Sequence, residues 1–395
     1  MNFELTEEQL AVKEAAREFA QKQCKPGVIE RDSKMEYPTE QIKMMAELGF
    51  LGMMVDPKYG GGGMDTISYV LALEEISKVD NSCSVIMSVN NSLVCWGLEK
   101  HGNEEQKQKY LTKLCTGEYI GAFCLSEPEA GSDATSQRTT AIDMGDHYLL
   151  NGTKNWITNG GTSRIHLVVA QSNVEKGHRG INVFIVDTKW EGVSIGAKED
   201  KLGIRSSDTH TIMYNDVKVP KENRLGEDGF GFKFAMKVLS GGRIGSAAQA
   251  LGIAGGAYEL AVAYANEREA FGKPIAQHQA ISFKLADMAT EIEAAKMLVY
   301  RSAWLKDQHR DFTMASSMAK VFASEVAMRQ TVEAVQIHGG YGFVKEYHVE
   351  RLMRDAKITQ IYEGTSEIQR IVISREIIKN NNLYVSVANG SMEHA

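Results

Sequence analysis

Apolar residues recur at three- and four-residue intervals through the first third of the chain, which is the spacing of amphipathic helices. The first helix is the best marked, because Thr6 and Gln9 form a capping box and Leu5 and Leu10 form a hydrophobic staple around it. The glycine run at 60–63 lacks the lysine and the spacing of a phosphate-binding loop, which favours a flexible connection. Further helices are expected at 39–48, 68–79, 84–100 and 104–116.

After Gly117 the period changes to two, as in half-buried strands. Asn151-Gly152 lies between two such runs and is the dipeptide most typical of a tight β-hairpin turn. Several short strands with turn signals between them predict a small barrel or sandwich. The expected strands cover 119–125, 146–150, 153–158, 166–170, 181–187, 193–195 and 209–214.

From Gly231 the helical period returns and persists. Small residues such as Gly252 and Gly256 favour close helix packing, as in a bundle. Long helices are expected at 232–268, 277–308, 315–338 and 367–380. The chain is therefore predicted to be a multidomain α+β protein, with an N-terminal helical domain at 1–117, a β domain at 118–230, a C-terminal helical bundle at 231–380 and a polar tail at 381–395.

Composition and charge exclude several classes of function. The formal net charge of −7 argues against nucleic acid, which needs a basic face, and no apolar run is long enough to predict a membrane span. Residues 1–22 are rich in glutamate and lack an apolar stretch, so neither a signal nor a transit peptide is expected. The five cysteines form no CxxC pair, and the histidines lack metal-binding spacing. These features predict reduced thiols, a cytoplasmic location and no metal site.

The most distinctive segment is 361–370, where an apolar approach ends in a lone carboxylate, Glu363, followed by Gly364. Ser366 and Gln369 then have the spacing of a capping box, so Glu363 is expected just before a helix N-terminus, where the helix dipole favours an anion. The spacing alone fits an ordinary acidic residue ahead of a helix better than it fits a catalytic base.

Four further segments combine polar or aromatic residues with glycine. Segment 124–133 offers serine hydroxyls and free N–H groups after a strand, and segment 155–161 places Trp156 and Thr158 on one face of a strand. Segment 268–275 puts an arginine at a helix end, and segment 336–343 breaks a helix with glycines. Taken singly, each segment fits a turn, a core tryptophan or a helix cap better than a ligand contact.

Together and in this order, the five segments resemble acyl-CoA dehydrogenases, and the resemblance covers nearly the whole chain. It implies an N-terminal α-helical domain, a central β-barrel and a C-terminal four-helix bundle. It also implies FAD bound between the β domain and the bundle, in a homotetramer built as a dimer of dimers.

The resemblance also assigns roles to individual residues. Glu363 matches the catalytic base, and Trp156 and Thr158 match the residues that face the flavin, with Thr158 near N5. Many relatives have threonine in place of Ser126 and aspartate in place of Ser240. The other cofactor-binding matches are Cys124, Leu125, Ser126, Gly131, Ser132, Ile157, Arg268, Phe271, Gln279, Gln336, Ile337, Gly339, Gly340, Thr365 and Glu367. The substrate-binding matches are Ser132, Ser240, Arg243, Tyr362 and Gly364.

The chemistry of the implied reaction agrees with these roles. Removing hydrogen from Cα and Cβ of an acyl thioester needs a base for the α-proton and an acceptor for the β-hydride. Because the α-proton is weakly acidic, fixed donors must polarise the thioester oxygen; in the family these are a ribityl hydroxyl of FAD and the N–H of the residue matching Glu363. A free glutamate has a pKa of about 4.3. Burial under an acyl chain is expected to raise the pKa of Glu363 more than the helix terminus lowers it.

The same comparison bears on the branch of the family. Isovaleryl- and long-chain-type relatives carry their base on a bundle helix before an arginine, at the position that is Gly242 here. Glutaryl-type relatives carry an arginine in the segment matching 83–85, and this chain has none there. Segments 85–93 and 241–245 are most similar to the short-chain, butyryl-type branch.

The resulting prediction is FAD-dependent α,β-dehydrogenation of a short-chain acyl-CoA to trans-2-enoyl-CoA. Glu363 is expected to abstract the α-proton, flavin N5 to accept the β-hydride, and electron-transfer flavoprotein to receive the electrons. An acyl-CoA oxidase, or a branched- or medium-chain dehydrogenase on the same fold, is the alternative. A flavin- or acyl-CoA-binding protein without turnover, or a purely helical scaffold, is more remote, because the chain has both Glu363 and the Trp156/Thr158 pair.

Overall fold

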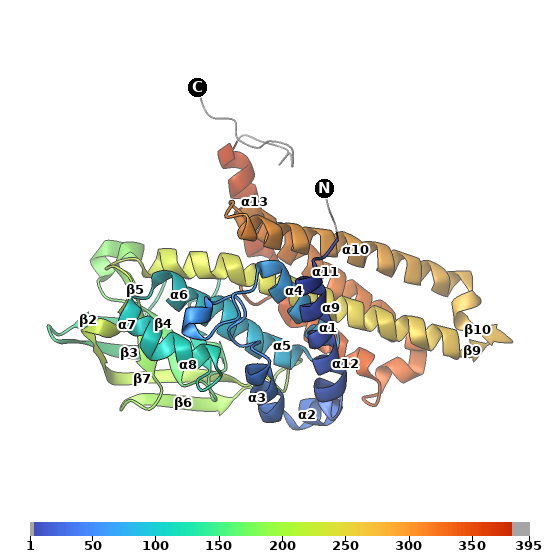
Figure 1. Ribbon diagram of the computed structural model, residues 1–395, viewed down its shortest axis with the longest axis horizontal. Coiled ribbons are helices and arrows are strands. Elements are labelled where there is room, and N and C mark those ends of the chain that lie inside the picture. Colours follow the sequence, from blue (N-terminus) through green and yellow to red (C-terminus); the bar gives the residue numbers. More distant parts are fainter. Residues whose placement is uncertain (1–3, 381–395) are drawn as a thin grey trace.

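The α, β, α order expected from the sequence is present in the computed structural model, which describes residues 4–380. In Figure 1 the strands of the large sheet lie at one end of the molecule, the long helices extend to the other end, and the first helices pack between them. The predicted fold class is confirmed. The predicted polar tail at 381–395 lies outside the described residues, and the predicted domain boundaries stay a prediction.

The N-terminal helices begin with the predicted capping box. Thr6 Oγ1 accepts a hydrogen bond from the N–H of Gln9 at 3.2 Å, and Gln9 Oε1 accepts one from the N–H of Thr6 at 3.0 Å. The helices are α1 (Glu7–Phe19), α2 (Val28–Lys34), α3 (Thr39–Glu47), α4 (Thr66–Ser77), α5 (Asn81–Ser88), α6 (Trp96–His101), α7 (Glu104–Gln106) and α8 (Thr112–Cys115). Three π-helical segments continue them, at Ala20–Cys24, Val89–Cys95 and Lys107–Leu111, so α5 and α6 form one helical run.

The β domain is one sheet of eight strands in the order β6-β7-β3-β2-β4-β5-β8, with β1 added beside β4. Strand β1 runs parallel to β4, whereas β3 is antiparallel to both β2 and β7. The strands are β1 (Gly121–Cys124), β2 (Thr140–Asp143), β3 (His147–Thr158), β4 (Ile165–Gln171), β5 (Ile181–Asp187), β6 (Val193–Lys198), β7 (Thr209–Pro220) and β8 (Arg224–Leu225).

The predicted hairpin at Asn151-Gly152 is wrong, because β3 passes straight through both residues. Gly152 has φ 148° and lies at a register shift between β3 and β7, where an added Cβ would be 2.5 Å from Thr139 Oγ1. Asn151 pairs across the sheet, donating from Nδ2 to Asp216 Oδ1 at 2.9 Å. The glycine therefore serves a β-bulge, and the chain reverses instead at Gly145, which has φ 97°.

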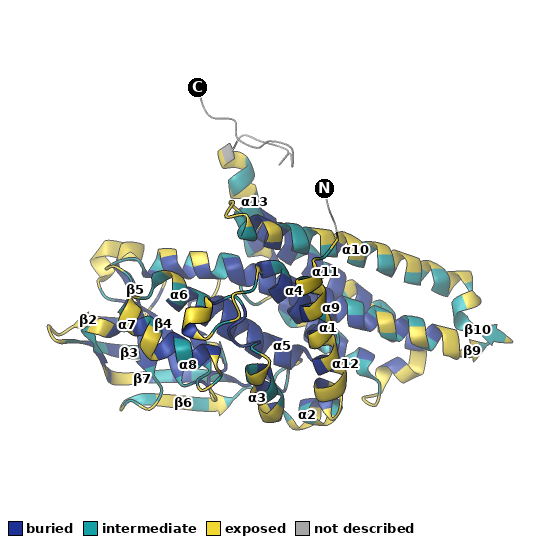
Figure 2. Cartoon of the chain, viewed as in Figure 1, coloured by how far each residue is buried: buried dark blue, intermediate teal, exposed yellow. Residues whose placement is uncertain are grey.

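The C-terminal bundle is built on α9 (Gly231–Glu267), which runs from beside the sheet to the far end of the molecule (Figure 1). Its small residues permit the predicted close packing: an added Cβ on Gly252 would lie 2.4 Å from the carbonyl oxygen of Glu74 in α4. Figure 2 shows α9 buried along most of its length and α10 exposed on its outer side. The other elements are β9 (Glu269–Ala270), β10 (Lys273–Pro274), α10 (Gln279–Asp307), α11 (Thr313–His338), α12 (His348–Thr359) and α13 (Ser366–Asn380).

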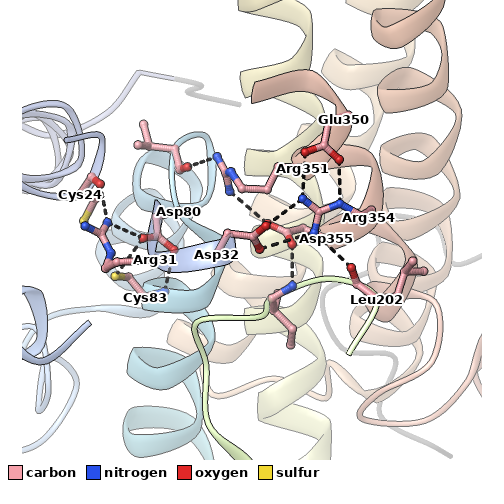
Figure 3. Close-up of polar contacts among 12 residues, drawn as sticks. Cys24, Arg31, Asp32, Asp80, Cys83, Leu202, Glu350, Arg351, Arg354 and Asp355 are labelled. Carbon is pink, nitrogen blue, oxygen red and sulfur yellow. Dashed lines mark hydrogen bonds and ion pairs between the residues drawn. The ribbon is translucent and has the colours of Figure 1, made fainter. Parts of the chain in front are cut away.

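Helix α12 was not expected, and its charged residues join it to the other two domains (Figure 3). Arg354 donates to Asp32 Oδ2 of α2 at 2.8 Å and to the carbonyl oxygen of Leu202 in the β domain at 3.1 Å. Asp355 accepts from the N–H of Ile204 at 2.5 Å and from Arg351 at 3.1 Å. Because α12 leads directly into the loop that carries Glu363, this charge network fixes that loop relative to the N-terminal and β domains.

Among residues 4–380, no helix is both long and apolar enough to cross a membrane. Within the same range no cluster of three or more His, Cys, Asp or Glu side chains has the arrangement to hold a metal ion.

Candidate active site

Glu363 and Gly364 form a tight turn between α12 and α13. Both have a left-handed backbone, with φ 52° at Glu363 and φ 96° at Gly364. A residue with a side chain is rare in this conformation, so the turn needs external support. Gln369 Nε2 donates to the carbonyl oxygen of Gly364 at 2.8 Å and to that of Glu363 at 3.3 Å, and Lys320 Nζ donates to the Gly364 oxygen at 2.8 Å.

The carboxylate of Glu363 lies in an environment that disfavours its charge. Its Oε2 is buried and has no hydrogen-bond partner among the described residues. Burial raises the pKa of Glu363 to about 7, although the nearby cations Lys320 and Arg243 act in the opposite direction. The direction agrees with the expected effect of desolvation, and it arises from the protein alone. A carboxyl group with a pKa near neutrality suits general-base catalysis.

Gly242 of α9 provides the space that the Glu363 carboxylate occupies. An added Cβ on Gly242 would lie 2.0 Å from Glu363 Oε2 and 2.7 Å from Leu93 Cδ2, far closer than non-bonded atoms approach. A side chain at Gly242 and this position of the Glu363 carboxylate therefore exclude each other. The position at which some relatives carry their base is filled here by the carboxylate of Glu363 itself.

The predicted capping box at Ser366 and Gln369 is wrong by one residue. Helix α13 begins at Ser366, and Thr365 Oγ1 accepts a long hydrogen bond, 3.4 Å, from the N–H of Ile368. The Gln369 side chain binds the Glu363–Gly364 turn instead of the helix N-terminus. Gln369 therefore supports the turn and does not cap the helix, and the hydroxyl of Ser366 has no hydrogen-bond partner among the described residues.

The predicted flavin loop after β1 is held by a buried ion pair that the sequence did not reveal. Lys154 of β3 is fully buried and donates to Glu127 Oε1 at 2.7 Å and to the carbonyl oxygen of Leu125 at 3.1 Å. The N–H of Asn155 donates to the carbonyl oxygen of Ser126 at 2.9 Å. These contacts place Leu125 and Ser126 directly beside the end of β3 that carries Trp156.

Trp156 and Thr158 share one face of β3, as expected. Ile157 between them is buried, whereas Trp156 is 62% exposed and Thr158 is partly exposed. A register shift between Lys154 and Ile157 and a φ of 61° at Trp156 mark a bulge that turns the indole outward. The left-handed backbone at Trp156 and the exposure of its indole ring both cost free energy. They leave a flat apolar surface free for a planar ligand.

One apolar cluster connects the flavin loop with the turn that carries Glu363. Leu125 and Leu93 are both buried in it, and Tyr362 packs against it. Tyr362 Oη donates to Gln249 Oε1 of α9 at 2.5 Å, which fixes the residue next to Glu363. Leu93 also borders the Glu363 carboxylate near Gly242. The two segments therefore border the same apolar cluster.

A second group of predicted cofactor residues lies at the far end of the bundle, around the β9–β10 hairpin (Figure 1). Arg268 lies over the ring of Tyr341 at 5.7 Å, and Phe271 is 97% exposed with φ 54°. Added Cβ atoms on Gly339 and Gly340 would meet nothing within 4 Å. The group lies at the ends of α9, α10 and α11 and in the hairpin between β9 and β10, and it consists of Arg268, Phe271, Gln279, Gln336, Gly339 and Gly340. Arg268 follows the end of α9, whereas the Glu363 carboxylate lies beside Gly242 on the same helix, so this group is about 39 Å along α9 from the Glu363 turn.

The other predicted residues fall into three settings. Cys124 and Ile337 are buried in the core, so their side chains face away from any ligand. Gly131, Ser132 and Glu367 are exposed. Ser240 donates to the carbonyl oxygen of Met236 at 2.9 Å within α9. Arg243 is buried beside Glu363, and its NH1 donates to Ser317 Oγ at 3.3 Å. It therefore contacts the surroundings of Glu363 and does not lie on the surface.

Both groups fit FAD in shape and chemistry. The site near Glu363 offers the outward-facing Trp156, the hydroxyl of Thr158 and the Leu125–Ser126 backbone. The group at the bundle end offers an arginine, an exposed phenylalanine and glycines with open space above them. Planar aromatic, hydroxyl and guanidinium groups are those expected to contact an isoalloxazine ring and a pyrophosphate.

Sequence comparison now identifies the class of protein. Three family models match consecutive parts of the chain: the acyl-CoA dehydrogenase N-terminal domain at residues 6–118, the middle domain at 122–217 and the C-terminal domain at 229–378. The chain belongs to the acyl-CoA dehydrogenase family, whose members are FAD-dependent oxidoreductases.

Individual relatives are similar over almost their whole length. The short-chain-specific acyl-CoA dehydrogenase of Clostridium acetobutylicum is 48% identical over 96% of this chain and 100% of its own. A subunit of the caffeyl-CoA reductase–Etf complex of Acetobacterium woodii is 48% identical over 95% of this chain and 99% of its own. The structure of butyryl-CoA dehydrogenase from Megasphaera elsdenii superimposes with a TM-score of 0.94 at 49% identity, covering 96% of this chain and 100% of that one.

Proposed function

We propose that the protein catalyses the FAD-dependent α,β-dehydrogenation of a short-chain acyl-CoA to the trans-2-enoyl-CoA, with Glu363 as the base that takes the α-proton. The observation that carries the proposal is the buried, unpartnered Oε2 of Glu363, whose pKa burial raises to about 7. A carboxyl group with that pKa is about half ionised near neutral pH, so it can both accept the α-proton and release it afterwards.

In this mechanism an α-proton passes to Glu363 Oε2 while the β-hydrogen leaves with its electron pair, so a carbon–carbon double bond forms. FAD, when bound, supplies the acceptor for that electron pair. Trp156, Thr158, Leu125 and Ser126 would orient the flavin ring. Lys154, through its bond to the Leu125 carbonyl, would keep the loop from shifting. Closure of an acyl chain over the Glu363 turn would exclude water and raise the pKa of the base further.

We propose a homotetramer, built as a dimer of dimers, as the working unit. The predicted pyrophosphate and adenosine contacts Arg268, Gln279, Gln336, Gly339 and Gly340 lie away from the Glu363 turn of the same chain, which supports their use by a neighbouring subunit. Phe271 lies at the same end of the bundle and is 97% exposed, so its ring is accessible to a neighbouring subunit.

We propose electron-transfer flavoprotein as the electron acceptor, because the similar Acetobacterium protein is named as a subunit of an Etf complex. The short acyl chain is proposed from the similarity to short-chain and butyryl-CoA dehydrogenases. Ser132, Ser240, Tyr362 and Gly364 are the proposed substrate contacts. We place the protein in the cytoplasm, where its five free cysteines would remain reduced.

The test begins with the colour of the purified protein, which should be yellow from bound FAD. Butyryl-CoA added without oxygen should bleach the flavin band, and Glu363→Gln should keep the colour and lose the bleaching. Bleaching followed by fast recovery in air would favour an acyl-CoA oxidase. A colourless protein that takes up no FAD, or a Glu363→Gln variant that bleaches at the original rate, would contradict the proposal.

A further inference from the structure

Lys320 of α11 is a buried lysine beside the Glu363–Gly364 turn. It is fully buried among small residues such as Ala319 and Ala323. A buried ammonium group is unfavourable unless it is paired and hydrogen-bonded. Its Nζ donates to the carbonyl oxygen of Gly364 at 2.8 Å, one residue from the base. The buried ammonium group therefore satisfies one of its hydrogen bonds by supporting the Glu363–Gly364 turn.

Charged and phenolic side chains of α4, α9, α11 and α13 surround the turn. Arg243 of α9 and Lys320 of α11 bring positive charge to Glu363, and the phenols of Tyr69 in α4 and Tyr362 face the same carboxylate. Glu367 of α13 and Arg243 also act on Lys320. Arg243 Nε has no hydrogen-bond partner, whereas Lys320 is bonded to the turn itself. Within residues 4–380, Lys320 is the one side chain that combines a charge next to Glu363 with a hydrogen bond to its loop.

We propose that Lys320 is a positioning residue for the base: its ammonium group holds the Gly364 carbonyl, which fixes the Glu363 turn, and its charge favours the ionised form of Glu363. This inference rests on the proposed role of Glu363 as the base.

The electrostatics support this assignment. Burial raises the pKa of Glu363 to about 7 and lowers the pKa of Lys320 to about 7, and each group's charge opposes the effect of burial on the other. Without the Lys320 ammonium, Glu363 would be harder to ionise. The pKa of Glu363 should then rise, and the base should become available only at higher pH.

Two replacements separate the charge from the hydrogen bond. Lys320→Met removes both while keeping an unbranched apolar stem, and Lys320→Gln removes the charge but keeps an N–H donor. Both should move the acidic limb of the pH profile of anaerobic flavin reduction by butyryl-CoA upward by about 1 unit. The rate on the plateau should fall more in Lys320→Met than in Lys320→Gln, because only the glutamine retains a donor for Gly364.

A second readout follows Glu363 without turnover. Infrared difference titration of the carboxylic acid C=O band, with Glu363→Gln as the blank, measures the ionisation of Glu363 directly. Its midpoint should rise by about 1 pH unit in both Lys320 variants. Lys78→Met is the matched control, since Lys78 is another shielded lysine of the helical core but pairs with Glu75 and Glu259. It should leave both the limb and the midpoint in place.

The outcomes distinguish this inference from the proposed function. If Glu363→Gln abolishes bleaching but neither Lys320 variant moves the limb or the midpoint, Lys320 has a structural role only and the inference is overturned. If Glu363→Gln bleaches normally, the base assignment fails first. Should Lys320→Met not retain FAD, Lys320→Gln decides the question, because the charge effect is expected in both.

Discussion

Replacing Gly242 by alanine tests whether the Glu363 carboxylate must occupy the space above α9. The new Cβ would lie 2.0 Å from Oε2, whereas an ordinary contact begins at 3.4 Å, so the carboxylate would have to retreat by about 1.4 Å. The wall formed by Leu93, 2.7 Å from the same Cβ, leaves little room for the methyl group to move instead. Misplacement of a reacting group by about 1 Å costs about 100-fold in rate.

We therefore expect Gly242→Ala to bleach its flavin with butyryl-CoA at least about 100-fold more slowly than the wild-type protein. Stopped-flow spectroscopy without oxygen at saturating substrate measures this rate, and the flavin absorbance of the purified protein shows whether FAD is retained. Overpacking against Glu363 and Leu93 should lower the unfolding free energy by about 1–3 kcal/mol. The gain of up to about 1 kcal/mol that alanine has over glycine within a helix offsets part of this loss.

Gly241→Ala is the control, because it adds the same methyl group one position earlier in the same helix. The nearest atom to its new Cβ would be Lys306 Nζ at 3.9 Å, an ordinary contact. This variant should reduce flavin at the wild-type rate and gain up to about 1 kcal/mol in unfolding free energy. Equal bleaching rates in Gly242→Ala and Gly241→Ala would refute the argument that the glycine reserves space for the base.

Three further outcomes are expected. Because the pKa of Glu363 is raised in the folded protein to about 7, the folded state binds a proton that the unfolded state has released, so stability falls as pH rises from about 4.5 to 7. Denaturant titration should find Glu363→Gln about 2 kcal/mol more stable than wild type at about pH 8 and equal to it at about pH 4. Lys154→Met leaves Glu127 buried without its cation and should lower the unfolding free energy by about 3 kcal/mol; a loss below about 1 kcal/mol would contradict the buried ion pair. Trp156→Ala should change stability by less than about 1 kcal/mol, because Trp156 is 62% exposed, and yet reduce FAD content; full FAD retention would remove Trp156 from the flavin site.

The sequence predicted the regular elements well where period and end signals agree. The capping box at Thr6 and the helices of the bundle are examples, because in both cases local hydrogen bonding and core packing favour the same structure. Helix α12 was missed because Arg351 and Asp355 are buried at positions where a helical pattern is expected to be apolar. Their burial depends on partners in other domains, which no local pattern contains.

The errors at Asn151-Gly152 and Ser366–Gln369 have a common physical origin. In both places the side chain usually hydrogen-bonds to the backbone nearby, but here it hydrogen-bonds to a more distant group. Asn151 binds Asp216 across the sheet, and Gln369 binds the Glu363 turn. Lys320 was overlooked for a related reason, since a lysine in a helix ordinarily faces water. Its spacing from the buried residues Ser316 and Ala323 is the one sequence signal that places it on the inner face.

The network on α12 limits how the three domains can be exchanged among relatives. Arg354 and Asp355 are neighbours in sequence, yet one binds Asp32 and Leu202 and the other binds Ile204 (Figure 3). A chimera that joins a foreign β domain to this bundle would lose the contacts of residues 202–204 with α12. A foreign N-terminal domain would lose the ion pair between Asp32 and Arg354. A functional chimera should therefore keep these contacts together with the base, because the position of the Glu363 loop depends on residues from all three parts of the chain.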